Sequence, residues 1–223
     1  MCFAPYISLA TFVIEFSLAL FFLLRDPRDN LNRMLALISF LLGFYQLNEF
    51  LICTTGFNLF SRLAVITTSL LPVLAVFFAL IVFRKKLRFY WRILICAPAV
   101  FFVLMFAISD ILRESATCMT IFIQYPYFGL VWSFLGLYYI VYLVAALILF
   151  YFASLSVKTK EERRLSHLGM LAMLIFTVPT FVFLLFLPVF NVQFPSVLCE
   201  FGLLLAIELI VLIWYKEKHN LKY

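Results

Sequence analysis

Charged residues are scarce in this chain. They make up 13% of its 223 residues, and it has only six glycines and two histidines. A soluble domain is about a quarter charged, whereas 66% of this sequence is hydrophobic. The core of one small globule cannot hide that much apolar surface, which excludes a soluble enzyme, a nucleic-acid-binding domain and a disordered chain. The composition predicts an α-helical protein that crosses a membrane several times.

The sequence also lacks a polar stretch long enough for a soluble domain. Its apolar runs are continuous, which favours helices over the alternating strands of a membrane barrel. Seven runs are long enough to span a bilayer: Tyr6–Leu24, Met34–Thr54, Leu63–Phe83, Trp91–Ile108, Gly129–Leu155, Leu168–Leu187 and Val197–Tyr215. We therefore predict an all-α membrane fold, a seven-transmembrane-helix bundle that occupies residues 1–223 as a single domain.

Basic residues are nearly absent from one side of this arrangement. Fifteen of the 17 Lys and Arg residues lie within 25–33, 84–92, 158–164 and 216–222; the other two are Arg62 and Arg113. Short loops rich in Lys and Arg stay in the cytoplasm, so we predict an outside N-terminus and a cytoplasmic C-terminus. The net charge of +6 orients the chain against anionic lipid of the bilayer and needs no nucleic acid.

Carboxylates inside the apolar runs have no basic partner in sequence. They are Glu15, Glu49, Glu200 and Glu208, and no Lys, Arg or His lies well inside a run. Because an ionised carboxylate in a membrane is costly, each must be protonated, hydrogen-bonded, hydrated or bound to a cation. Glu15 and Glu208 each lie about 15 Å below the outer face, and on neighbouring helices they could share one proton. The alternative is that each is a hydrogen-bonding residue between helices.

Further polar residues follow helical spacing near the outer face. Gln46 and Glu49 lie on one stripe with Asn48 beside it, and Tyr138 and Tyr142 share a stripe further along the chain. We predict a ligand-binding cavity open to the outside, lined by Glu15, Gln46, Asn48, Glu49, Tyr138, Tyr142, Glu200 and Glu208. The tyrosines have the alternative role of packing. Prolines inside the runs either act as hinges or leave carbonyls that neighbouring helices satisfy.

Four of the five cysteines are predicted to lie at the outer face. These are Cys2, Cys53, Cys118 and Cys199, whereas Cys96 lies in the inner half of its run. An oxidising exterior permits disulfides, but four cysteines allow three pairings. Free thiols and a soft-metal site are the alternatives, although no CxxC or histidine spacing indicates a metal.

Several catalytic and cofactor patterns are missing. The last apolar run has no Lys for a retinal Schiff base, no intramembrane His pair is present to ligate haem, and no GxSxG motif marks a serine nucleophile. We therefore expect no enzymatic activity, no cofactor and no metal.

Short motifs suggest two resemblances. The opening Met1-Cys2-Phe3-Ala4 and the later Gln46-Leu47-Asn48-Glu49 resemble a group of uncharacterised bacterial multi-pass membrane proteins that begin with Met-Cys-Phe followed by Ser or Ala. Asn30-Leu31-Asn32-Arg33, Tyr125-Pro126-Tyr127-Phe128 and Arg163-Arg164 resemble, more distantly, the seven-helix N-terminal sensor region of bacterial histidine kinases. The first resemblance implies a location in the bacterial cytoplasmic (inner) membrane.

These observations predict a sensor or small-ligand receptor with an outward polar cavity. Without a kinase domain, it would signal through a cytoplasmic or membrane protein partner at the basic loops. Two alternatives remain open: a small secondary transporter coupled to protons or cations through Glu15 and Glu208, and a structural subunit of a membrane complex.

Overall fold

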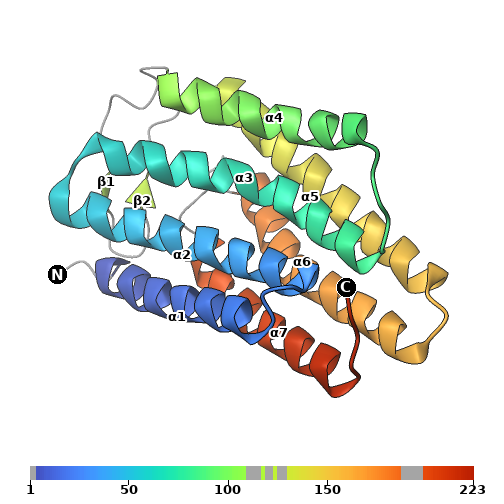
Figure 1. The fold of residues 1–223 in the computed structure, drawn as a ribbon. Coiled ribbons are helices and arrows are strands. Elements are labelled where there is room, and N and C mark those ends of the chain that lie inside the picture. The colour runs from blue at the N-terminus through green and yellow to red at the C-terminus, as the bar shows by residue number, and fades with distance from the viewer. Residues whose placement is uncertain (1–3, 109–116, 119–122, 125–129, 187–197) are drawn as a thin grey trace.

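The computed structural model of the chain describes residues 4–108, 117–118, 123–124, 130–186 and 198–223. These ranges contain seven helices and one small hairpin (Figure 1). The helices are α1 (Ala4–Arg25), α2 (Asn30–Thr55), α3 (Asn58–Val82), α4 (Phe89–Ile108), α5 (Leu130–Ser156), α6 (Lys160–Phe186) and α7 (Leu198–Lys218). Strand β1 (Thr117–Cys118) pairs antiparallel with β2 (Ile123–Gln124), a hairpin that hydropathy did not predict.

Helix α6 begins two turns before the predicted start at Leu168. Its first turns are polar, and Thr159 accepts a hydrogen bond through its side-chain oxygen from the backbone N–H of Glu162 at 3.2 Å. Glu161 and Glu162 lie in the first turn, where the helix dipole favours negative charge. A search for apolar runs detects only the part of a helix that suits the membrane core, and it therefore missed these polar turns.

Helices α3 and α7 end in the same way. At the end of α3, the N–H of Lys85 donates to the carbonyl of Leu80 at 3.2 Å, and at the end of α7 the N–H of Leu221 donates to the carbonyl of Lys216 at 3.0 Å. Arg84 and Asn220 take the left-handed conformation that this Schellman motif requires, with φ of 54° and 50°. Both chain reversals are thus fixed by local hydrogen bonds.

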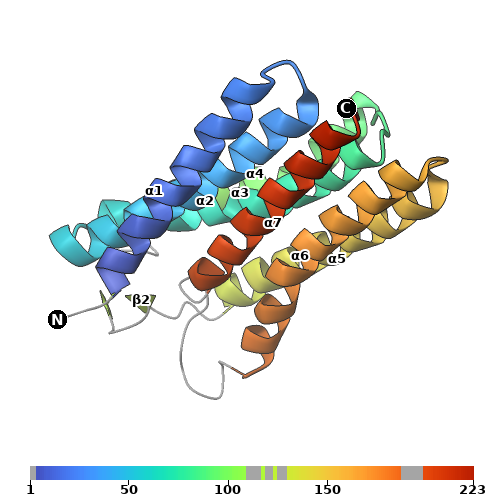
Figure 2. The ribbon, with the colours of Figure 1, turned by 90° about the horizontal axis from the view of Figure 1, so that it is seen from below.

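The helices pack mainly against their sequence neighbours, and α3 and α7 make the further contacts. Helix α3 packs against α5 as well as α2, and α7 returns to contact α1 and α2. Helix α4 packs against α3 and lies on the outside of the bundle (Figure 1); in the view from below in Figure 2 it is largely hidden behind α2 and α3. The arrangement encloses an apolar core that draws on α2, α3, α5, α6 and α7.

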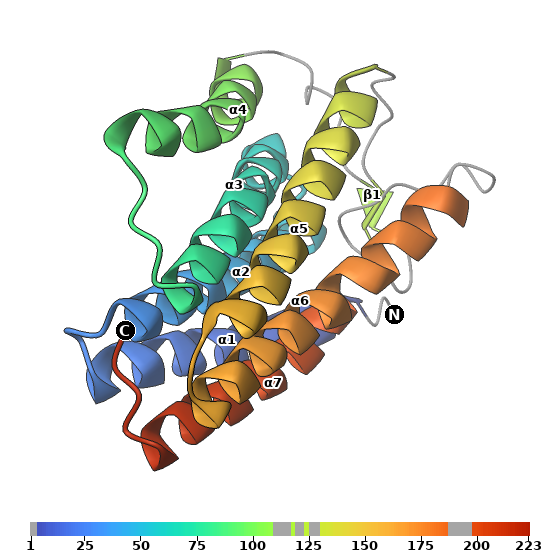
Figure 3. The same cartoon turned by 90° about the vertical axis from the view of Figure 1, so that its right-hand side faces the viewer.

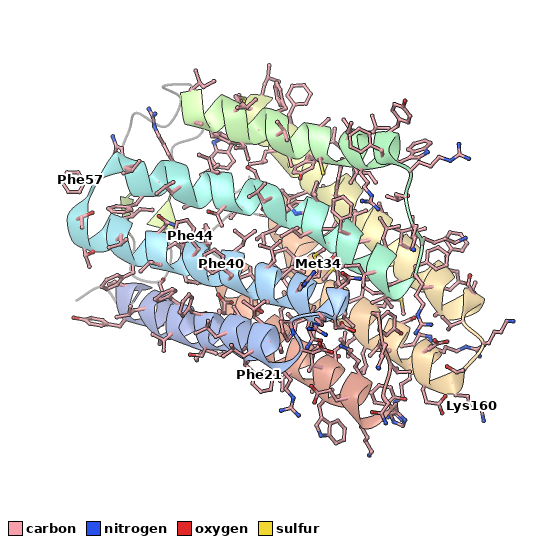
Figure 4. The ribbon with its side chains drawn as sticks, in the orientation of Figure 1. Phe21, Met34, Phe40, Phe44, Phe57 and Lys160 are labelled. Atoms are coloured by element: carbon pink, nitrogen blue, oxygen red, sulfur yellow. A yellow bond between two sulfur atoms is a disulfide. The ribbon has the colours of Figure 1, made fainter. Side chains whose placement is uncertain are left out.

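Large apolar side chains also cover the outside of the bundle. Figure 4 shows Phe21, Phe40, Phe44 and Phe57 on this surface, and Phe40 and Phe44 stack with their ring centroids 6.1 Å apart. Exposed apolar surface of this extent is rare on soluble proteins. Helices α1 to α5 are each long and apolar enough to cross a membrane. The chain thus has the dimensions and the surface of an integral membrane protein.

The four basic segments lie at one end of the bundle, and the hairpin lies at the other (Figure 1). Ion pairs connect the basic segments: Arg25 with Glu217 at 2.7 Å, and Arg84 with Glu162 at 3.0 Å. We call this the basic end. The grouping follows from helices that alternate in direction along the chain.

Candidate functional site: buried carboxyl groups between α1, α2 and α7

The predicted polar residues on α1 and α2 are buried between helices. Glu15 is 1% exposed, Gln46 3%, Asn48 1% and Glu49 2%. These side chains are thus closed off from solvent in the structure, and their role in binding a ligand stays a prediction. They form a closed polar seam, because α7 and the neighbouring turns of α1 cover the polar face of α2. The side chains of Glu200 and Cys199 lie outside the described residues.

Glu49 is held by hydroxyl groups. The hydroxyl of Tyr45, one turn earlier on α2, donates to Glu49 Oε1 at 2.6 Å. The hydroxyl of Ser8 on α1 donates to Glu49 Oε2 at 3.5 Å. A carboxylate that accepts bonds from hydroxyls on two helices has part of its lost hydration replaced. Glu49 thus joins α1 to α2 in the part of the seam nearer the end of α2.

Glu15 has no such arrangement. Neither of its carboxyl oxygens has a hydrogen-bond partner among the described residues. Glycines leave room for it on both sides: a Cβ built on Gly43 of α2 would lie 3.3 Å from Glu15 Cβ, and one built on Gly202 of α7 would lie 2.8 Å from Glu15 Oε1. The carboxyl group therefore occupies a slot between α1, α2 and α7, and Glu49 is the carboxylate with which it interacts electrostatically.

The shared proton between Glu15 and Glu208 is absent from the structure. A shared proton needs a hydrogen bond between the two carboxyl groups, and Glu15 makes none within the described part of the chain. Helices α1 and α7 are neighbours, as that hypothesis required, but the Glu15 carboxyl meets α7 at Gly202. Glu208 lies six residues further along α7, about 9 Å at 1.5 Å per residue. It is only half-buried.

The predicted ligand residues Tyr138 and Tyr142 bind backbone carbonyls instead. Tyr138 and Tyr139 donate to the carbonyls of Ser69 and Thr68 on α3, the first at 2.9 Å. Pro72 has no N–H, so the carbonyl of Thr68, four residues earlier, lacks its helical donor. Tyr139 satisfies that carbonyl. The tyrosines therefore repair the break in α3, which supports the second of the two interpretations of the prolines.

A similar contact reaches α4. Tyr142 donates to the carbonyl of Ile95 at 2.7 Å, one turn before Pro98. The ring of Tyr138 packs against Phe102 with centroids 5.3 Å apart. Helix α5 thus fastens two proline-containing helices, α3 and α4. These bonds give the tyrosines a structural contribution that only the packing of three helices reveals, and their ligand contacts stay a prediction.

A buried ion pair lies at the basic end. Lys216 Nζ is 2.8 Å from Asp29 Oδ1 and donates to Asn32 Oδ1 at 2.7 Å. Asp29 is the N-cap of α2 and accepts from the backbone N–H groups of Leu31, Asn32 and Tyr223. Burial alone would raise the pKa of Asp29, but the hydrogen bonds from Lys216 and from the backbone outweigh it and hold that pKa below its ordinary value of 3.8.

Residues 219–223 connect α2 and the end of α3 at the basic end. The N–H of Asn30 donates to the carbonyl of Tyr223 at 3.2 Å, and Arg84 donates to the carbonyl of Lys222 at 3.1 Å. The guanidinium of Arg84 also lies over the Tyr223 ring, 4.6 Å from its centroid. Burial, opposed by Arg84, raises the pKa of Tyr223 to about 12. These contacts offset the cost of the left-handed conformation of Arg84, about 1 to 3 kcal/mol.

Sequence reasoning missed this network. It counted Lys216 and Arg84 only as loop charges, because each lies in a basic stretch at the end of an apolar run. The N-cap position of Asp29 before an apolar run was the one local signal available. The partners are 184 and 187 residues apart, and no local pattern connects residues so distant in sequence.

Cys53 and Cys118 form a disulfide, with their Cα atoms 5.7 Å apart. It ties the β1–β2 hairpin to the end of α2, at the opposite end from the basic residues. This pairing takes two thiols away from the soft-metal alternative, and the described residues hold no cluster of metal-ligating side chains. Cys96 is a free thiol. Cys2 and the side chain of Cys199 lie outside the described residues.

Comparison of the chain with family models, curated proteins and solved structures gives no match. The two resemblances drawn from short motifs stay predictions. Function must therefore be argued from the arrangement of the residues themselves.

Proposed function

We propose that this protein crosses the membrane seven times, with its N-terminus outside and its C-terminus in the cytoplasm of a bacterial cell. Two features support this orientation. The four basic segments lie together at one end, where the positive-inside rule places the cytoplasm. The disulfide between Cys53 and Cys118 lies at the other end, and disulfides persist in oxidising compartments. The resemblance to bacterial multi-pass proteins supports the inner membrane.

This topology is tested by labelling. Impermeant thiol reagents should reach Cys53 and Cys118 only after reduction, and should not reach Cys96. A reporter that works only in the cytoplasm should be active when it is fused after Tyr223. External access to that reporter would contradict the proposed orientation.

We further propose that the protein is a small secondary transporter coupled to protons or cations, with Glu15 and Glu49 as the coupling site. The observation that carries this proposal is the Glu15 carboxyl, 1% exposed and without a hydrogen-bond partner among the described residues. Ionisable residues at membrane depth are costly and mark ion pathways and proton relays. Two interacting carboxyl groups cannot both ionise cheaply, so a proton or a cation relieves the pair.

Infrared spectroscopy tests the coupling site without a known substrate. In reconstituted protein, the difference spectrum between acid and alkaline pH should contain a carboxyl band that Glu15→Gln removes. Glu208→Gln is the matched control, because Glu208 is also a carboxyl of the bundle but does not belong to the seam. The band should persist in this control. If it persists in Glu15→Gln as well, Glu15 is not the titrating group.

Whole-cell uptake tests the transport itself. Against a panel of small solutes, we expect wild-type uptake that collapses with the proton or sodium gradient. Glu15→Gln should leave the protein folded and abolish the coupled uptake, because an amide does not titrate. Coupled uptake by this variant would exclude Glu15 from the mechanism.

A sensor that signals through a partner protein is the second candidate. The observation in its favour is that residues 219–223 bind α2 and Arg84, so a movement of α7 would be passed to the basic loops. A pull-down with the 85–92 segment intact or neutralised separates the two functions. A partner captured only by the intact segment, together with no gradient-driven uptake, would favour the sensor.

A further inference from the structure

The buried residues of helix α4 all lie in its second half. They are Ala99, Phe102 and Phe106, and in the first half Tyr142 of α5 donates to the carbonyl of Ile95. Residues 88–94 are all exposed. Because a helix turns once in 3.6 residues, these nearly two turns of α4, the free turns, are exposed around their whole circumference. Figure 3 shows α4 on the outer side of α3 and α5.

The free turns have the composition of a membrane interface. Phe89, Tyr90 and Trp91 are 71%, 81% and 56% exposed. Aromatic residues of this kind lie at the level of lipid headgroups. In a bilayer, the exposed apolar side chains of the free turns lie against lipid.

The charge of the adjoining segment selects the headgroup. Residues 84–92 contain five basic residues and no acidic residue, whereas each of the other three basic segments includes Asp or Glu. Arg84 is paired with Glu162. The four that remain, Lys85, Lys86, Arg88 and Arg92, are exposed. Such a cluster beside a membrane helix attracts anionic lipid.

We propose that the first turns of α4 and the basic segment before them bind a phospholipid with an anionic headgroup. Its phosphate would contact Lys85, Lys86, Arg88 and Arg92, and its acyl chains would lie along the free turns of α4 toward Ile95. The proposal depends on membrane insertion with the basic end at one leaflet, and it is independent of the coupling role of Glu15.

Tryptophan quenching by brominated lipid tests this site. The variant Trp132→Phe/Trp214→Phe keeps Trp91 as the only tryptophan, and Trp91→Phe/Trp132→Phe keeps Trp214 as the matched control. Trp214 is on α7 and is 59% exposed. In nanodiscs of phosphatidylcholine, brominated phosphatidylglycerol should quench Trp91 at least twice as strongly as brominated phosphatidylcholine at the same mole fraction. The two lipids should quench Trp214 equally.

Neutralising the basic residues is the second test of this site. Lys85→Gln/Lys86→Gln/Arg88→Gln/Arg92→Gln should remove the preference at Trp91, and Lys158→Gln/Lys160→Gln/Arg163→Gln/Arg164→Gln should retain it. The cytoplasmic reporter after Tyr223 confirms that each variant inserts correctly.

Three results would overturn the proposal. Equal quenching of Trp91 by the two lipids would exclude anionic selectivity. An equal preference at Trp214, or loss of the preference in both neutralised variants, would show general enrichment of anionic lipid around a cationic protein. Weak quenching of Trp91 by either lipid, together with cross-linking of two copies through α4, would assign this surface to a dimer.

Discussion

Asp29 and Glu15 are both buried carboxyl groups, and the protein treats them in opposite ways. Asp29, 6% exposed, accepts hydrogen bonds from three backbone N–H groups and forms an ion pair with Lys216. Glu15, 1% exposed, has no hydrogen-bond partner within the described residues and lies between two glycines. Similar burial therefore accompanies a complete set of partners at Asp29 and no hydrogen-bond partner at Glu15 among the described residues.

The difference indicates where the structure is fixed and where chemistry can occur. A fully paired carboxylate holds its helices in one arrangement, and breaking it is costly. An unpaired buried carboxyl has little structural value, so its burial is better explained by an exchange of protons or cations. The contrast makes the basic end a structural anchor and the Glu15 seam the functional candidate.

The largest expected effect comes from Lys216→Met, which removes the cation and leaves Asp29 buried without it. We expect a loss of about 3 to 5 kcal/mol in the free energy of unfolding, because an uncompensated charge stays inside the protein. Thermal unfolding in one detergent measures it. Asp29→Asn/Lys216→Met should recover part of the loss, since asparagine keeps the N-cap without the charge. A loss below about 1 kcal/mol would mean that water replaces Lys216.

Acid should weaken the same anchor. Because the pKa of folded Asp29 lies below 3.8, its contribution is complete above that pH and is lost as the pH falls through the folded pKa. The unfolding midpoint of wild type should therefore fall more steeply below about pH 4 than that of Asp29→Asn. Parallel curves for the two proteins would remove Asp29 from the acid sensitivity.

Tyr139→Phe should have a smaller effect, about 0.5 to 2 kcal/mol, because it leaves the carbonyl of Thr68 without a donor. Pro72→Ala supplies the helical N–H that proline lacks, so Tyr139→Phe should cost less in that background. Unfolding of the two single variants and the double variant gives the coupling. Additive effects would show that Tyr139 stabilises α3 by packing alone.

Glu15→Gln should have the smallest effect on stability, and it tests most directly how Glu15 differs from Asp29. Since Glu15 makes no hydrogen bond in the described structure, we expect a change below about 0.6 kcal/mol, the average value of an interhelical bond in a membrane. Glu49→Gln is the matched variant and should cost more, because the Tyr45 and Ser8 hydroxyls lose a charged acceptor. A large loss in Glu15→Gln would make Glu15 structural and would weaken the coupling proposal.

Much of the fold could be predicted from local patterns in the sequence. Apolar runs predicted the seven helices, because the length of such a run depends only on consecutive residues. The ends were less accurate, as the two polar turns at the start of α6 show. The neighbouring positions of α1 and α7, which the shared-proton hypothesis assumed, are found in the structure.

Local patterns in the sequence were enough to predict the helices and the grouping of the basic residues. They also showed that no Lys, Arg or His lies well inside the apolar runs that carry the carboxyl groups. Three features depend on how the helices pack. Glu15 meets Gly202 rather than Glu208, Cys53 pairs with Cys118, and Tyr139 donates to the carbonyl of Thr68. The reason is physical. Hydropathy and charge are properties of short segments, whereas the rotation of each helix about its axis depends on side chains from helices distant in sequence.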